Sequence, residues 1–264
     1  MTKLDALFEA TREEARAALI GYLPAGYPSL AGSKAVLAAM VDAGCDIVEI
    51  GIPFSDPVMD GPTIQAAAGA ALRGGFRVRD VFDVVESVAS AGGLAVVMTY
   101  WNPVYRYGVD AFARDLASAG GLGIITPDLI PDEAAEWMDA STAHGLDRIF
   151  LLAPSSTQDR IVTTVAASSG FVYAASVMGV TGAREQVSSS AAELVGRIRV
   201  HTDIPIGVGL GVRSGAQAAE LAAVADAVIV GSAFVSRAAQ GVAEVRALAA
   251  ELAEGVRGTV STIG

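Results

Sequence analysis

The stretch Cys45-Asp46-Ile47-Val48-Glu49-Ile50 is the most informative guide to the fold of this chain. Its apolar residues follow one another without regular polar alternation, which is typical of a strand buried on both faces of a parallel sheet. The run Ala227-Val228-Ile229-Val230, near the other end of the chain, has the same character. Such runs indicate an α/β protein in which helices separate buried strands.

Eight short β-rich runs are spaced along the chain, at residues 19–23, 45–50, 94–100, 123–126, 148–153, 171–175, 204–209 and 227–230. Helical patterns lie between them, among them residues 30–43, 63–72, 78–91, 111–119, 132–144, 191–200 and 217–224. Strand and helix repeated eight times predict either a (β/α)₈ barrel or a doubly wound sheet.

The glycine pattern and the chain length favour the barrel. A doubly wound dinucleotide-binding sheet would carry a Gly-x-Gly-x-x-Gly turn after its first strand, and Pro24-Ala25-Gly26-Tyr27-Pro28 does not fit that turn. The chain has 264 residues, close to the roughly 250 of a typical barrel. We therefore predict a (β/α)₈ TIM barrel, a single domain over residues 1–264. An extra helix (4–17) precedes the barrel, a last helix (233–252) closes it, and a frayed tail (255–264) follows.

The composition narrows the range of partners and locations. Apolar residues make up 52% of the chain, but none of their runs approaches the roughly 20 residues that span a bilayer. The first residues show no basic-then-apolar signal pattern. The net charge of −11 disfavours nucleic acids and anionic membranes as partners. We expect a soluble, cytoplasmic protein that binds neither.

The scarcity of amines, imidazoles and thiols restricts the chemistry. Lys3 and Lys34 are the only lysines, and both are expected on helices away from the catalytic mouth of a barrel. A Schiff-base mechanism is therefore disfavoured. His144 and His201 are the only histidines and follow helices, so a histidine-rich metal site is not expected. Cys45, the single cysteine, is expected to be a buried apolar residue rather than a nucleophile.

Two carboxylates are the strongest catalytic candidates. Glu49 lies near the carboxyl end of an apolar strand, where burial raises the pKa of a carboxyl toward neutrality and suits it to proton transfer. Asp60 follows in the loop after the same strand. Structural alternatives stay open, because Glu49 fits a satisfied strand residue and Asp60 fits a helix cap or turn residue equally well from pattern alone.

Glycine-bearing loops follow the last three strands and predict a phosphate site. They are Gly179-Val180-Thr181-Gly182, Gly209-Leu210-Gly211 and Gly231-Ser232, the last of which opens a helix. Glycines let backbone amides approach a phosphate, and the loops after strands seven and eight hold phosphate in many barrels. Arg213 is a possible contributor to this site.

The stretch Glu49-Ile50-Gly51-Ile52-Pro53-Phe54-Ser55-Asp56-Pro57, followed by Asp60-Gly61-Pro62-Thr63-Ile64-Gln65, resembles the signature of the tryptophan synthase α subunit family. The segments Met98-Thr99-Tyr100-Trp101-Asn102-Pro103, Pro127-Asp128-Leu129 and Leu152-Ala153-Pro154-Ser155 agree in order and spacing, as do the late glycine loops. The resemblance extends over residues 4–252 and implies retro-aldol cleavage of indole-3-glycerol phosphate to indole and glyceraldehyde 3-phosphate.

The resemblance also implies a role for particular residues. Glu49 matches the general acid–base, and Asp60 matches the carboxylate that binds the indole N–H. The positions matched to phosphate binding are Gly182, Gly211, Gly231 and Ser232. Those matched to the indole pocket are Tyr22, Met98, Tyr100 and Tyr173, which also fit ordinary barrel packing. Asp128 and Thr181 match residues that support mobile loops.

The family further implies an α₂β₂ complex, in which the β subunit carries pyridoxal phosphate and this chain holds no cofactor or metal. We expect the partner surface near residues 53–60 and 101–107, with Pro57, Trp101, Pro103 and Tyr105 exposed. Three alternatives stay open: a stand-alone lyase of the same fold, a catalytically silent barrel that activates a β-type partner, and a phosphosugar isomerase.

Overall fold

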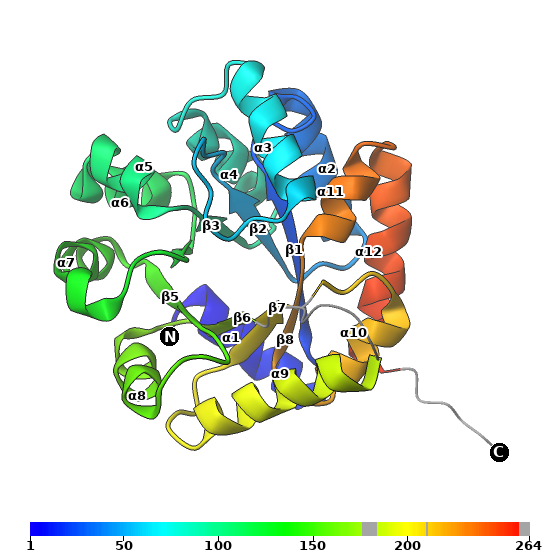
Figure 1. Cartoon of the computed structure of the whole chain (residues 1–264). Helices are drawn as coiled ribbons and strands as arrows, with labels where there is room; N and C mark the ends of the chain where they lie inside the picture. Colours follow the sequence, from blue (N-terminus) through cyan, green and yellow to red (C-terminus); the bar gives the residue numbers. More distant parts are fainter. Residues whose placement is uncertain (176–183, 210, 259–264) are drawn as a thin grey trace.

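The computed structural model describes residues 1–175, 184–209 and 211–258, and it shows a closed barrel of eight parallel strands (Figure 1). Each strand pairs with the next one in sequence, and β8 returns to pair with β1. The predicted (β/α)₈ barrel is thus confirmed, and the closed sheet excludes a doubly wound one. The strands are β1 (Ala18–Pro24), β2 (Ile47–Gly51), β3 (Ala95–Met98), β4 (Gly123–Thr126), β5 (Asp147–Leu152), β6 (Val172–Ala175), β7 (Ile206–Gly209) and β8 (Ala227–Val230).

Helices surround the barrel on its outer side, as Figure 1 shows. They are α1 (Lys3–Glu13), α2 (Leu30–Asp42), α3 (Pro62–Arg73), α4 (Asp80–Ser90), α5 (Trp101–Tyr107), α6 (Val109–Ser118), the 3₁₀ turn η1 (Pro131–Glu133), α7 (Ala135–His144), α8 (Gln158–Ala167), α9 (Arg184–Arg199), α10 (Gly215–Ala222), α11 (Ser232–Ala238) and α12 (Val242–Arg257). None of the helices in the described part of the chain is long and apolar enough to cross a membrane.

Apolar packing fills both sides of the strands. Alternate residues point inward and outward along a strand, so Ile20 and Ile47 belong to the cluster inside the barrel while Leu19 and Val48 belong to the layer under the helices. The inner cluster also contains Leu4 and Phe8 of α1, which are 0% and 3% exposed. The extra N-terminal helix therefore closes the amino-terminal end of the barrel and leaves its carboxyl end as the open mouth.

Several element boundaries differ from those expected. Helix α1 ends at Glu13, and the chain turns at Ala15 with a φ of +53°, so the residues before Ala18 do not continue the helix. The expected closing helix is two helices, α11 and α12, separated at Gly241, where φ is +127°. Helix α12 continues to Arg257, so residues 255–257 of the expected frayed tail are helical, while residues 259–264 lie outside the described residues.

Candidate active site at the mouth of the barrel

A cavity of about 140 Å³ opens at the carboxyl ends of the strands. Six residues singled out from the sequence line it together: Tyr22, Glu49, Asp60, Met98, Tyr173 and Gly231. They come from β1, β2, the loop after β2, β3, β6 and the turn after β8, so strands from all around the barrel contribute. Met59 and Gly209 also line it, and four apolar residues that the sequence reasoning missed complete the wall: Ile64, Leu151, Ala175 and Ile229. Three of these four lie on strands, and their position on a strand was the only feature of the sequence that could have indicated a place in the wall.

Glu49 is held in an apolar environment by its strand. It lies on β2 opposite Tyr22 of β1 and Val96 of β3, and it is 1% exposed. Its Oε2 atom has no hydrogen-bond partner among the residues that the structure describes. Burial, and secondarily the charge of Asp60, raise the pKa of Glu49 from 4.5 to about 8. The carboxyl is therefore largely protonated at neutral pH and faces a cavity to which it can deliver a proton.

Asp60 is in a different environment on the same cavity. It lies in the loop between β2 and α3 and is only half-buried. Burial raises its pKa, while a hydrogen bond from the Tyr100 hydroxyl acts in the opposite direction and favours the carboxylate. Two carboxyl groups with environments this different can divide the acid and electrostatic roles between them.

Tyr100 lies at the edge of this arrangement rather than on the wall of the cavity. Its hydroxyl accepts hydrogen bonds from the backbone N–H groups of Val58, at 3.2 Å, and Met59, at 3.1 Å. The ring also packs beside Phe54, with the two ring centroids 5.2 Å apart. Tyr100 thus fixes the loop that carries Asp60, and its contact with the indole ring stays a prediction.

Tyr22 and Tyr173 each lie across a glycine on the next strand. A Cβ atom built on Gly51 would come well within 3.0 Å of the Tyr22 hydroxyl, and one on Gly209 would collide in the same way with the Tyr173 hydroxyl. Burial raises the pKa of both tyrosines well above the usual range, with further contributions from Glu49 and Asp60. Both phenols therefore stay neutral and present flat, uncharged surfaces to the cavity.

The residues matched to phosphate binding are only partly described. Gly231 lines the cavity, and Ser232 begins α11 beside it. Gly211 follows β7 with a φ of +62°, a backbone conformation that glycine adopts without strain. The predicted positions Gly182 and Thr181 lie outside the described residues.

A second hollow, of about 410 Å³, adjoins the start of α11. Ser232 lines it together with Thr63, Arg213 and Arg237. The Arg213 side chain makes no ion pair or hydrogen bond within the described ranges, and its backbone N–H donates to Oε1 of Gln217 at 2.8 Å. A guanidinium group is thus available next to the serine expected to bind phosphate.

Side-chain contacts organise the neighbouring loops. Oδ1 of Asp128 accepts a hydrogen bond of 2.8 Å from the backbone N–H of Trp101, which ties the loop after β4 to the start of α5. Within α5, Tyr105 is 64% exposed, as expected for a partner surface, and Trp101 is half-buried. The expected exposure of Pro103 is wrong, because the unpredicted helix α5 turns this proline inward.

The amines and imidazoles lie away from the mouth. Lys3 and Lys34 are on α1 and α2, and His144 ends α7, where its Nε2 lies 2.9 Å from Oδ1 of Asp110. His201 follows α9 and contacts Gln158. The residues with assigned positions contain no cluster of three or more His, Cys, Asp or Glu side chains suited to a metal ion. Carboxyl groups, phenols and backbone amides are therefore the polar groups of the cavity.

Comparison with known proteins agrees with this geometry. The profile of the family described as "Tryptophan synthase alpha chain" matches residues 8–262. The chain belongs to the tryptophan synthase alpha chain family. A tryptophan synthase alpha chain of Nocardia farcinica is 70% identical over 256 residues, which cover 97% of this chain and 96% of that one. One of Mycobacterium tuberculosis is 64% identical, over 97% and 95% of the two chains.

Solved structures extend the agreement to the fold. A chain in a structure of Mycobacterium tuberculosis tryptophan synthase superposes with a TM-score of 0.93 at 64% identity, covering 98% of this chain and 99% of that one. The tryptophan synthase α subunit of Legionella pneumophila gives 0.88 at 28% identity, with 97% and 98% covered. The assignment to the tryptophan synthase alpha chains makes this protein a lyase of tryptophan biosynthesis.

Proposed function

We propose that this tryptophan synthase alpha chain cleaves indole-3-glycerol phosphate to indole and glyceraldehyde 3-phosphate, with Glu49 and Asp60 as its catalytic residues. One observation carries the assignment of roles: a fully buried carboxyl with a pKa of about 8 shares a small cavity with a second, half-exposed carboxyl. Together with the family assignment, this arrangement favours acid–base cleavage of a carbon–carbon bond.

The reaction follows from the protonation states. Glu49 arrives protonated and gives its proton to C3 of the indole ring, which makes the ring nitrogen iminium-like. Asp60 accepts a hydrogen bond from the ring N–H and stabilises the positive charge. The side-chain hydroxyl next to the breaking bond loses its proton to the Glu49 carboxylate and becomes the aldehyde carbonyl. The electrons of the broken bond return to the ring, so indole and the triose phosphate leave and Glu49 is protonated again.

Other residues bind the substrate in this proposal. Tyr22, Met98 and Tyr173 flank the indole ring. The phosphate lies against the backbone of Gly211, Gly231, Ser232 and the predicted Gly182. Tyr100 and Asp128 hold the loops around the mouth in place through the contacts given above, and Thr181 supports the strand-six loop as predicted. Neutral phenols suit an apolar ring, and glycine backbones suit a phosphate.

We propose a β subunit carrying pyridoxal phosphate as the partner, in an α₂β₂ complex, and a cytoplasmic location. The exposed side chains of Val58 (76%), Met59 (49%) and Tyr105 (64%) support a contact surface around the loop after β2 and helix α5. Apolar and aromatic groups of this kind are enriched in the cores of protein interfaces. The chain itself needs no cofactor for the steps above.

The test is indole release from indole-3-glycerol phosphate, measured with and without the β subunit. We expect release by the wild-type chain, a large increase on mixing, and loss of release with retained β binding for Glu49→Gln. Equal rates without and with the partner favour a stand-alone lyase. Activation of the β subunit without any cleavage favours a silent barrel. Turnover of phosphosugars that lack indole favours an isomerase. Each of these outcomes contradicts the proposal.

A further inference from the structure

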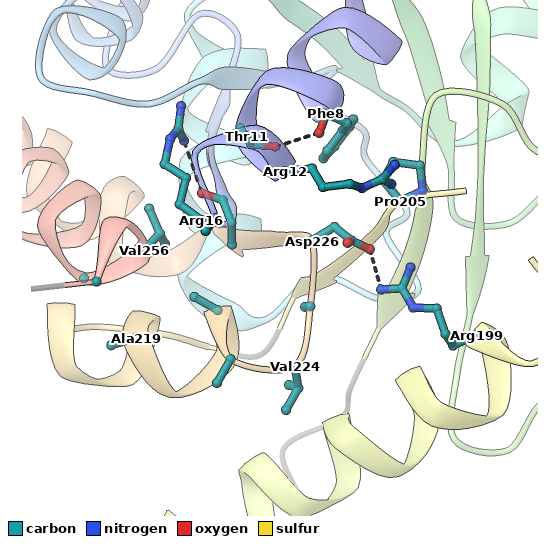
Figure 2. A pocket seen from close by; sticks show the side chains of 17 residues that line it. Phe8, Thr11, Arg12, Arg16, Arg199, Pro205, Ala219, Val224, Asp226 and Val256 are labelled. Carbon is teal, nitrogen blue, oxygen red and sulfur yellow. Dashed lines mark hydrogen bonds and ion pairs between the residues drawn. The ribbon is translucent and has the colours of Figure 1, made fainter. Parts of the chain in front are cut away.

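A hollow lies at the opposite end of the barrel from the mouth. Its volume is about 520 Å³, within the range of small-molecule sites. Helix α1, the end of α9, α10 and the end of α12 surround it, together with the residues that lead into β7 and β8 (Figure 2). Nothing in the cleavage reaction uses this hollow. Its charged lining residues are Arg12, Arg16, Arg199 and Asp226.

Two of the three arginines have structural partners. Arg16 donates to both carboxylate oxygens of Asp46, at 2.9 Å each, and also to Glu14. Arg199 donates to Asp226 at 2.5 Å, and the same carboxylate oxygen accepts the backbone N–H of Ile206 at 2.7 Å. These pairs connect the helices to the ends of the strands, and their charges are compensated within the fold.

Arg12 is different. Its guanidinium has no hydrogen bond or ion pair with any residue in the ranges 1–175, 184–209 and 211–258. Figure 2 shows the side chain extending from α1 past Phe8 toward Pro205, along one wall of the hollow. An uncompensated positive charge beside a hollow is notable in a chain of net charge −11, where acidic groups outnumber basic ones.

The rest of the lining is mainly apolar. Pro205, Ala219 and Val224 contribute the accessible apolar surface, whereas Phe8 and Val256 also line the hollow but are only 3% and 2% exposed. The charge of Asp226 is compensated by Arg199, so Arg12 carries the one unpaired charge among the described residues that line the hollow. One free cation beside an apolar wall selects a ligand with a single negative charge and an apolar body.

We propose that this hollow is a binding site for a small monocarboxylate with an apolar body about the size of one ring. The carboxylate pairs with the Arg12 guanidinium, which offers it two parallel N–H donors. The ring lies against Pro205 and the other accessible apolar residues of the lining. The site is separate from the mouth of the barrel, so its ligand and indole-3-glycerol phosphate bind at the same time.

Phenylacetate is the probe, and binding is measured by NMR titration of the isotope-labelled chain. We expect a dissociation constant of about 1 mM, given the small size of the probe. Phenylacetamide, which keeps the ring but not the charge, and acetate, which keeps the charge but not the ring, are each expected to bind about tenfold more weakly. Inorganic phosphate is expected not to displace phenylacetate.

Arg12→Gln is the decisive variant, and we expect it to weaken phenylacetate binding about tenfold, the loss typical of one charge-assisted pair. Ala219→Leu, which fills the hollow without changing charge, should weaken it similarly. The matched control is Arg79→Gln, which removes one positive charge at a side chain that is 79% exposed, and it should leave binding unchanged. Equal affinity of Arg12→Gln and the wild type for phenylacetate overturns the proposal. Equal affinity of the wild type for phenylacetamide and phenylacetate overturns it as well. In either case the probe binds elsewhere or without the arginine.

Discussion

Replacing Glu49 with glutamine is expected to stabilise the folded chain increasingly as the pH rises, while it removes the cleavage activity. Burial raises the pKa of Glu49 from 4.5 to about 8, so the folded state holds a proton that the unfolded state loses. Below pH 4.5 both states are protonated, and Glu49 does not lower the free energy of unfolding. As the pH rises from 4.5 toward 8, the free energy of unfolding falls progressively. Glutamine has almost the same shape and does not ionise, so this loss disappears in the variant.

The magnitude follows from the size of the shift. One pKa unit corresponds to about 1.4 kcal/mol of free energy. The ordinary pKa of 4.5 lies about 2.5 units below pH 7. Keeping Glu49 protonated in the folded state therefore lowers the free energy of unfolding of the wild type by roughly 3 kcal/mol at pH 7. At pH 8.5 the cost reaches its ceiling of roughly 5 kcal/mol. For a chain of this size, 3 kcal/mol corresponds to a rise in Tm of about 6 °C.

The assay is urea unfolding of both proteins at pH 5, 7 and 8.5, followed by circular dichroism. The new amide can change packing or hydrogen bonding, but this changes the free energy of unfolding of the variant by the same amount at every pH. Only the change in protonation makes the difference between variant and wild type depend on pH. Glu86→Gln, on an exposed position of α4, makes the same chemical change as a control. A difference between Glu49→Gln and the wild type that stays the same from pH 5 to 8.5 would refute the reasoning.

Three further predictions concern activity. The kcat/KM for indole-3-glycerol phosphate should fall as the pH rises through about 8, because Glu49 must be protonated to act as an acid; a pH–rate profile that stays flat to pH 10 contradicts this. Gly51→Ala should lower both the cleavage rate and the Tm, because the new methyl group displaces Tyr22. A variant with the activity and the melting curve of the wild type would contradict the close contact between the two residues. Arg213→Gln should raise KM about tenfold with little change in kcat, and it should also flatten the salt dependence of kcat/KM. Arg73→Gln on α3 serves as its control, and an equal effect of both variants rules out a local role.

The barrel was predictable because its strands are buried on both faces. Runs such as Val228-Ile229-Val230 have no polar alternation, and that pattern survives in a single sequence. The same pattern made Glu49 a candidate, since an acidic residue inside such a run needs either a partner or a chemical role, and the family resemblance supplied the catalytic role. The structure adds that its Oε2 lacks a partner among the residues with assigned positions, which no sequence pattern reveals.

Features that depend on contacts between distant segments were not predictable. Helix α5 has seven residues and begins where Asp128 of the next loop accepts the N–H of Trp101, so its start depends on a residue 27 positions away. The inward turn of Pro103 follows from that helix. The hydrogen bonds that the Tyr100 hydroxyl accepts from the N–H groups of Val58 and Met59 likewise join residues 42 and 41 positions apart.

The overlap of each cavity tyrosine with a glycine on the neighbouring strand has an evolutionary consequence. The Tyr22 hydroxyl fills the space that a side chain at position 51 would need, and Tyr173 does the same at position 209. The two residues of each pair therefore restrict the substitutions that the other accepts. A lineage that acquires a larger residue at position 51 before the tyrosine is replaced by a smaller residue passes through a less stable and less active ancestor. The reverse order leaves only a void. Descendants with reshaped mouths should therefore have lost the ring first and gained the new side chain afterwards.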